Sequence, residues 1–267
     1  MIRLSRTVRF TIPGNPSATA GPPRNGFGGK PAMQGLGRYY ELTVRCAGEP
    51  DAQTGYLVNI KEIDKATHAV VVPVITAACA ERPETDAHAL LPEIVSALDG
   101  SLPASIESVV WKLTPHCSVE METDMPDQAI IRQRFDFAAA HRLNCGELSE
   151  EENRRIFGRC NHPSGHGHNY MVEPAIALEL GNSSFSSEDI ERIVAETVID
   201  PFDHTNLDED HEAFSTTGNG LTSSVEHIAR VFYELLSPEI ERASNGTATL
   251  RSMTVWETDR TSATYPG

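Results

Sequence analysis

Three histidines and one cysteine in the second half of the chain have the types and spacing of a metal-dependent catalytic site. His166 and His168 are separated by one residue, Cys160 precedes them, and His141 lies further upstream. On a β-strand, residues i and i+2 project from the same face, so His166 and His168 can reach one ion. Three imidazoles leave the fourth position of a tetrahedral zinc open to water or substrate, as in catalytic zinc sites. The sequence therefore predicts one zinc ion per chain on His141, His166 and His168.

The segments around these residues carry more information than the histidine pair. A His-x-His pair alone is a weak signal, because surface histidines also fall into this spacing. Four segments extend the pattern: Phe137–Leu143, Cys160–Tyr170, Pro201–Asp208 and Trp256–Asp259. In this order they closely resemble the 6-pyruvoyltetrahydropterin synthase family, over about residues 131 to 265.

The resemblance implies a reaction and a role for further residues. The implied enzyme is a zinc-dependent carbon-oxygen lyase that converts 7,8-dihydroneopterin triphosphate to 6-pyruvoyltetrahydropterin and triphosphate. Cys160 matches the family's general base, and Asp203 with His204 matches the pair that assists proton transfer. Glu257 matches the glutamate that grips the pterin ring, and Ser224 stands where the family usually has a threonine contacting that ring. Taken singly, each residue also has an ordinary explanation, such as a buried inert thiol, a turn or an exposed strand residue.

Two other functions stay open. The 6-carboxytetrahydropterin synthases of the queuosine pathway resemble the same segments, but they usually show Cys-x3-His-Gly-His. The present chain has five residues between Cys160 and His166, as in the pyruvoyl enzymes. A non-catalytic pterin-binding or scaffold protein is the third possibility, and retention of every proposed catalytic position argues against it.

Several arginines lie close in sequence to the proposed site. They could form a positively charged mouth for a phosphorylated substrate, or a solvated helix face paired with Glu150–Glu152 at helical spacing. The residues concerned are Arg142, Arg154, Arg155 and Arg159.

Hydrophobic periodicity predicts the fold class of the second half. Strands are expected near 130–140 and 168–180, amphipathic helices over 187–199 and 224–236, and two strands over 247–257 and 259–265. Strands in this order with one layer of helices predict an α+β fold. Ser223 and Glu226 have the spacing of a helix capping box. The resemblance implies the T-fold, in which such sheets from several domains close into a barrel.

The first half aligns with the second as a degenerate repeat. Val8–Gly14 aligns with Phe135–His141, and Gly35–Tyr40 aligns with Gly165–Tyr170, so the first half has lost the histidines. We therefore expect two tandem T-fold domains, a metal-free domain at 1–128 and a catalytic domain at 129–267. In the first, Asp51–Asn59 predicts a turn followed by a strand, and the glycine- and proline-rich segment 13–37 predicts a long loop.

Composition limits the partners. Hydrophobic residues make up 39% and charged residues 22% of the 267 residues, which is ordinary for a soluble globular protein. A net charge of -16 disfavours nucleic acid and anionic membranes as partners. We expect no apolar run of membrane-spanning length, and the N-terminus lacks the apolar core of a signal peptide, which favours the cytoplasm. Five scattered cysteines without a Cys-x-x-Cys agree with a reducing compartment.

The resemblance also implies an oligomer. Family barrels contain three domains, with the Asp-His pair and the cysteine contributed by neighbouring domains. If the two halves alternated around one barrel, each Cys160 would face Ile75 and Thr76 of a first half. Retention of Asp203 and His204 therefore favours a homotrimer, with one catalytic barrel and one metal-free barrel.

Overall fold

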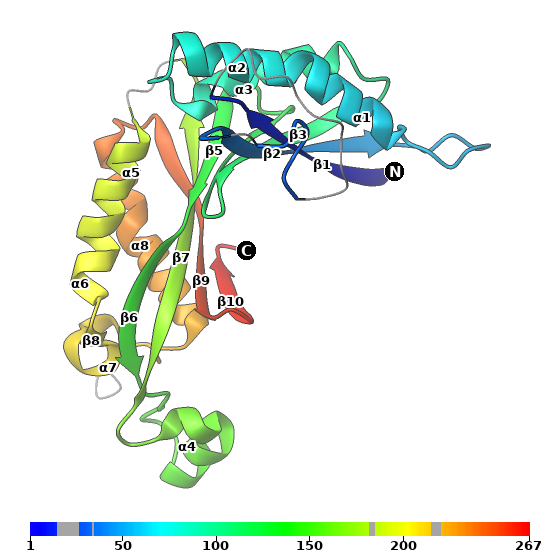
Figure 1. Cartoon of the computed structure of the whole chain (residues 1–267). Helices are drawn as coiled ribbons and strands as arrows, with labels where there is room; N and C mark the ends of the chain where they lie inside the picture. The colour runs from blue at the N-terminus through cyan, green and yellow to red at the C-terminus, as the bar shows by residue number, and fades with distance from the viewer. Residues whose placement is uncertain (15–26, 34, 182–184, 215–219) are drawn as a thin grey trace. The chain divides into compact units, whose positions relative to one another are not determined.

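The computed structural model describes residues 1–14, 27–33, 35–181, 185–214 and 220–267 (Figure 1). The chain divides into two compact units. Unit 1 is Met1–Ile131 with Leu178–Asn182, and unit 2 is Arg132–Ala177 with Ser183–Gly267. Part of the predicted loop over 13–37 and of the segment after Gly181 lies outside the described residues.

Unit 1 is an antiparallel sheet with helices on one face. Its first four strands pair in chain order: β1 (Ile2–Ile12), β2 (Arg38–Gly48), β3 (Ile106–Thr114) and β4 (Cys117–Glu122). Strand β5 (Gln128–Gln133) contains the boundary between the units. The helices that contact β1, β3 and β4 are α1 (Ile60–Ala66), α2 (Val72–Glu81) and α3 (Leu91–Asp99).

The core of unit 1 follows from the two-residue period of its strands. Alternate residues of the two strands are buried: Val8 and Phe10 on β1, and Leu42 and Val44 on β2, with Val8 directly opposite Leu42. The helices bury Ile63, Ile75, Ile94 and Leu98.

Residues 56–59, predicted as a strand, are a bend leading into α1, while the predicted turn before them is present. In this turn the Asp51 carboxylate accepts hydrogen bonds from the backbone N–H groups of Gln53 and Thr54, so these donors need no partner strand.

One helical run in unit 1 differs from the expectation on apolar segments. Ile60–Glu81 spans 22 residues, and its most apolar 18-residue window has a mean hydropathy of 1.3, which is enough by length and composition to cross a membrane. A third of its most apolar window (33%) is buried in the fold. A core helix of a soluble protein meets the same criterion, so this run is weak evidence for a membrane span.

Unit 2 has the predicted α+β arrangement. Its strands are β6 (Phe135–His141), β7 (His166–Glu179), β8 (Thr205–Asn206), β9 (Ala248–Thr258) and β10 (Thr261–Tyr265), in the spatial order β8-β6-β7-β9-β10. Strand β8 runs parallel to β6, and the β6–β7 and β9–β10 pairs are antiparallel. Helix α8 (Val225–Ala243) packs on β9 and β10. The remaining helices are α4 (Glu150–Phe157), α5 (Ser187–Val194), α6 (Asp200–Phe202) and α7 (Leu207–Asp210).

The two units share a strand register. Phe10 lies opposite Tyr40 in the β1–β2 pair, and Phe137 lies opposite Tyr170 in the β6–β7 pair. In both pairs the rings are close, with centroids 6.0 Å and 5.1 Å apart. This register is the one that the repeat alignment requires.

The units also share an unusual helix. In unit 1, α1 continues through a π-helix, Thr67–Val71, into α2, which has Pro73 near its start. In unit 2, α5 continues through a π-helix, Ala195–Ile199, into α6, which has Pro201 near its start. Because π-helices are rare, the same interruption before a proline in both units supports the proposal that they are copies of one fold.

Candidate metal centre and active site

Strands β6 and β7 bring the three predicted ligands together. His141 ends β6 directly opposite His166 at the start of β7, and His168 follows two residues later. Their ligand atoms lie within 4.8 Å of one another, and the Nε2 atoms of His141 and His166 are 3.1 Å apart. Gly165 has φ +65°, and a Cβ there would come 2.9 Å from the His141 carbonyl oxygen. A glycine is therefore required where the chain enters β7 beside His141.

Glu257 on β9 lies directly beside this triad of histidines. Its Oε1 atom is 3.4 Å from His141 Nε2 and 3.7 Å from His168 Nε2. Atoms that each lie about 2.0–2.2 Å from one tetrahedral zinc are about 3.3–3.6 Å apart. The observed separations are close to that range, so the donor set fits a small divalent ion.

The electrostatics of the triad suit metal ligation. Burial lowers the pKa of His141, with a further lowering by His166 and His168, against the opposing effects of the Ser223 carbonyl and Glu257. Burial also lowers the pKa of His168. Both shifts favour the neutral imidazole of His141 and His168, which is the form that binds a metal.

Three polar atoms at the centre lack hydrogen-bond partners among the described residues. They are His166 Nδ1, His168 Nε2 and the Tyr170 hydroxyl, and all three are buried. Burial, followed by the charges of Glu257, Asp208 and Cys160, raises the pKa of Tyr170. Because buried polar groups are normally satisfied, three orphaned atoms on neighbouring side chains indicate a site that receives another group.

A chain of hydrogen bonds fixes the orientation of His141. Its ring Nδ1 donates to the backbone carbonyl of Ser223 over 2.8 Å, which directs Nε2 toward the other histidines. The Ser223 hydroxyl donates to Asp208 over 2.8 Å, and the backbone N–H of Arg142 donates to the same carboxylate. Sequence analysis did not single out Ser223 or Asp208 for this positioning, and only the tertiary fold brings them to His141.

Cys160 lies at the edge of this region. It belongs to a 3-10 helix, Gly158–Asn161, that follows α4, and its carbonyl accepts a hydrogen bond from the Leu143 N–H. The buried Asn161 amide donates to the Leu143 carbonyl and so holds the same segment beside the end of β6. The Cys160 thiol is half-buried and free, and its charge contributes to the raised Tyr170 pKa.

Asp203 and His204 form an ordered pair at the outer edge of β6. Asp203 Oδ1 accepts from the Ala138 N–H over 2.8 Å, and Oδ2 lies 2.7 Å from His204 Nδ1. The Ala138 hydrogen bond, followed by that of His204, lowers the pKa of Asp203. His204 has φ 59° and an 81% exposed side chain. Among the described residues, no hydrogen bond, ion pair or ring contact joins it to the triad.

An arginine-lined cavity of about 540 Å³ adjoins His166. Arg142, Arg154 and Arg159 line it together with His162. Arg154 also lies 3.8 Å from Glu150, one turn earlier on α4. Three of the four arginines therefore surround one cavity, as expected for a positively charged mouth. Arg154 also forms the ion pair at helical spacing that was the alternative expectation.

The start of α8 differs from the capping box expected at Ser223 and Glu226. Ser224 is the N-cap of α8, and its side chain accepts from the backbone N–H of His227. Ser223, which was expected to form a capping box with Glu226, instead donates to Asp208. The helix starts one residue later than the pattern suggested, because the Ser223 hydroxyl has this buried partner.

Three further histidines of unit 2 lie outside the triad. His162 is exposed. His211 stacks on Phe202 with centroids 4.0 Å apart, and the His227 ring contacts Thr222, so both are half-buried structural residues.

Comparison with known proteins identifies the family that unit 2 resembles. A family model described as 6-pyruvoyl tetrahydropterin synthase matches residues 130–267. Human 6-pyruvoyl tetrahydrobiopterin synthase is 33% identical over 143 residues, covering 52% of this chain and 92% of the human protein. A putative 6-pyruvoyl tetrahydrobiopterin synthase of Caenorhabditis elegans is 36% identical over 141 residues, covering 52% of this chain and 95% of the relative.

The family match covers half of the chain, which therefore belongs to the 6-pyruvoyl tetrahydropterin synthase family. The predicted resemblance is confirmed. Among solved structures, that of the Caenorhabditis elegans 6-pyruvoyl tetrahydropterin synthase is similar at 32% identity and a TM-score of 0.45, covering 52% of this chain and 96% of the solved one.

Proposed function

We propose that the chain is a zinc-dependent lyase that converts 7,8-dihydroneopterin triphosphate to 6-pyruvoyltetrahydropterin and triphosphate. The observation that carries this proposal is the convergence of His141, His166 and His168, within 4.8 Å, in a unit that belongs to this family. The relatives carry that activity in their names.

The three histidines would hold the metal. Zinc bound there supplies a Lewis acid that polarises a hydroxyl oxygen of the substrate side chain. The low imidazole pKa values of His141 and His168 keep their lone pairs available at neutral pH. Because the described part of unit 1 offers no comparable group, we propose one ion per chain.

The residues around the histidines would move protons and bind the substrate. Cys160 is the proposed general base, since a thiol near a cation loses its proton more easily. The arginine-lined cavity beside His166 would receive the triphosphate, because guanidinium groups bind phosphate oxygens bidentately. The reaction breaks one carbon-oxygen bond and redistributes electrons within the substrate, so it needs no external oxidant.

Glu257 has two possible roles. As a pterin ligand it would accept hydrogen bonds from the ring, with Ser224 as a second contact. As a fourth metal ligand it would close the coordination sphere, and its 3.4 Å separation from His141 Nε2 permits this. Glu257→Gln distinguishes the roles: a substrate ligand predicts a raised KM with full zinc content, and a metal ligand predicts weakened zinc binding.

Assembly is part of the proposal. Among the described residues, no hydrogen bond, ion pair or ring contact joins Asp203 or His204 to the triad of their own unit, and His204 is 81% exposed. This supports a homotrimer in which the pair of one chain completes the site of its neighbour.

The direct test is incubation with 7,8-dihydroneopterin triphosphate, with and without a chelator, followed by identification of the pterin product. We expect 6-pyruvoyltetrahydropterin and triphosphate, loss of activity with chelator and recovery with zinc. Release of acetaldehyde would instead identify a 6-carboxytetrahydropterin synthase. Unchanged substrate with zinc-loaded protein would contradict both activities and leave a binding protein.

A further inference from the structure

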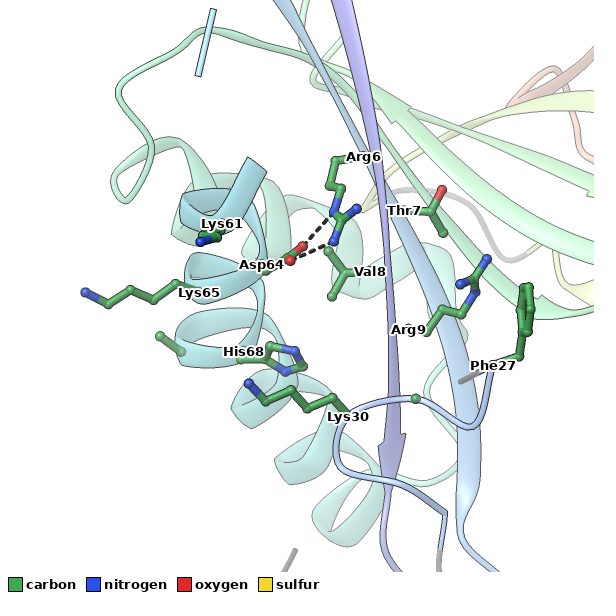
Figure 2. A pocket seen from close by; sticks show the side chains of 12 residues that line it. Arg6, Thr7, Val8, Arg9, Phe27, Lys30, Lys61, Asp64, Lys65 and His68 are labelled. Carbon is green, nitrogen blue, oxygen red and sulfur yellow. Dashed lines mark hydrogen bonds and ion pairs between the residues drawn. The ribbon is translucent and has the colours of Figure 1, made fainter. Parts of the chain in front are cut away.

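Unit 1 contains a cavity of about 830 Å³ with a strongly cationic lining (Figure 2). It lies between the outer edge of β1, the segment 27–30 and helix α1 with the π-helix that follows. Its volume is within the range of small-molecule sites, which is about 300–1,000 Å³. No residue of the proposed active site lines it.

The lining has an excess of positive charge. The chain has a net charge of -16 and contains only four lysines, yet three of them, Lys30, Lys61 and Lys65, line this cavity. Arg6 and Arg9 add two guanidinium groups. In a chain that is so acidic, this concentration of cations on one cavity sets up a local field that attracts anions.

The arginines are held in place by acidic partners. Arg6 donates two hydrogen bonds, of 2.8 and 2.7 Å, to Asp64, which is the one carboxylate in the lining (Figure 2). Arg9 lies 3.2 Å from Glu41 and 4.4 Å from the centre of the Phe27 ring. None of the three lysines has an ion-pair partner among the described residues. The uncompensated positive charge therefore belongs to the lysines. The two arginines are already paired with carboxylates, which hold their side chains in fixed positions.

The pKa of His68 responds to the same positive charge. In Figure 2 its ring lies beside Lys30. Burial has the larger effect and lowers the His68 pKa, the Lys30 charge lowers it further, and Asp64 opposes both.

Backbone N–H groups at the edge of β1 are also available to bind an anion. The Lys30 N–H donates to the Arg9 carbonyl, which shows that the peptide groups of Arg9 face away from β2. By the alternation of an antiparallel strand, the N–H of Thr7 faces the same edge and the same cavity.

The corresponding surface of unit 2 lacks this charge. The shared strand register aligns Arg6 with Gln133 and Arg9 with Asp136. Gln133 donates to Glu191 on α5, as Arg6 donates to Asp64 on α1, so the link between strand and helix is kept while the cation is replaced. The cationic lining is thus a property of unit 1 and not of the fold.

We propose that this cavity binds a small phosphorylated anion, with the three lysines that have no ion-pair partner among the described residues, Lys30, Lys61 and Lys65, as its main charged contacts. Several cations around one space suit a multiply charged group better than a single carboxylate. Phe27 is 78% exposed beside Arg9 and offers an aromatic face. The anion is therefore either an inorganic phosphate chain or the phosphoryl group of a compound with an aromatic ring.

The test uses the full-length protein, with inorganic pyrophosphate as the probe and the His68 ring proton resonances as the reporter. These resonances are assigned with His68→Gln. They distinguish this cavity from the arginine-lined cavity of unit 2, which can also bind phosphates. We expect pyrophosphate to shift them and to raise the pKa of His68, because a bound anion offsets the Lys30 charge.

Charge-removing variants complete the experiment. In Lys30→Gln/Lys65→Gln we expect the affinity measured at His68 to fall about tenfold or more, which corresponds to about 1.4 kcal/mol. Lys112→Gln removes the fourth lysine, outside the cavity, and is the matched control with affinity unchanged. GTP binding more tightly than pyrophosphate, with the gain lost in Phe27→Leu, would identify an aromatic ligand. His68 resonances that pyrophosphate does not move, or equal losses in the Lys112→Gln control, would overturn the proposal.

Discussion

Replacing Asp208 tests the hydrogen-bond chain that orients the metal centre. In Asp208→Ala, the Ser223 hydroxyl loses its acceptor at 2.8 Å, and Ser223 is fully buried at 0% exposure. A buried donor left unsatisfied costs about 1–3 kcal/mol. The Arg142 N–H also loses its acceptor, but this residue is half-buried, and water can replace the carboxylate there.

The same change should loosen His141. Its Nδ1 bonds to the carbonyl of Ser223, so a shift of Ser223 turns the imidazole. Loss of such an outer contact typically lowers metal affinity about 10- to 100-fold. That factor equals about 1.4–2.7 kcal/mol, which agrees with the cost estimated from the buried hydroxyl.

Two assays measure these effects. Urea unfolding of the metal-free protein gives the stability loss, and competition with a chromophoric chelator gives the zinc affinity. Asp208→Asn keeps an acceptor oxygen for Ser223 and should fall between wild type and Asp208→Ala. Glu209→Ala, at the exposed neighbouring residue, is the control. Wild-type zinc affinity in Asp208→Ala, or an equal loss in Glu209→Ala, would refute the reasoning.

Three other outcomes follow from the same geometry. Cys160→Ala should keep fold and metal while turnover falls about a hundred- to ten-thousandfold, and Lys112→Glu in unit 1 should change nothing catalytic; full activity of Cys160→Ala would remove the general-base assignment. Because burial lowers the pKa values of His141 and His168, these groups bind protons more readily when unfolded. Stability of the metal-free protein should therefore fall as the pH drops below about 6.5, toward the lower folded pKa values, and a urea midpoint that does not move in that window would contradict this. Solution mass should correspond to three chains, whereas a stable active monomer or dimer would show that the interface argument is wrong.

The sequence predicted the parts of the site that depend on the repeat of side chains along a strand or a helix. His166 and His168 share a face because strand residues alternate, and their place on β7 follows from that alone. The α+β arrangement of unit 2 also follows from its pattern of strands and amphipathic helices.

The sequence did not predict which residues later in the chain surround His141 besides the other two histidines. His141 and Ser223 are separated by 82 positions, and only the packed fold brings them together. Glu257 was assigned a substrate contact, and its position beside His141 Nε2 also became apparent only from the structure. Local contacts also replaced the predicted strand at 56–59 and the capping box at Ser223. The Tyr56 carbonyl accepts from the Asp51 N–H within the turn, and the Ser223 hydroxyl donates to Asp208.

The account depends most on one metal centre per chain at the three histidines. Elemental analysis of purified protein, loaded with zinc and dialysed, tests this most directly. We expect about one equivalent in the wild type and in Cys160→Ala, and none retained in His166→Ala/His168→Ala, because only two of the four tetrahedral positions would then have candidate protein ligands. Two equivalents per chain, or full retention of zinc in the double variant, would contradict the account.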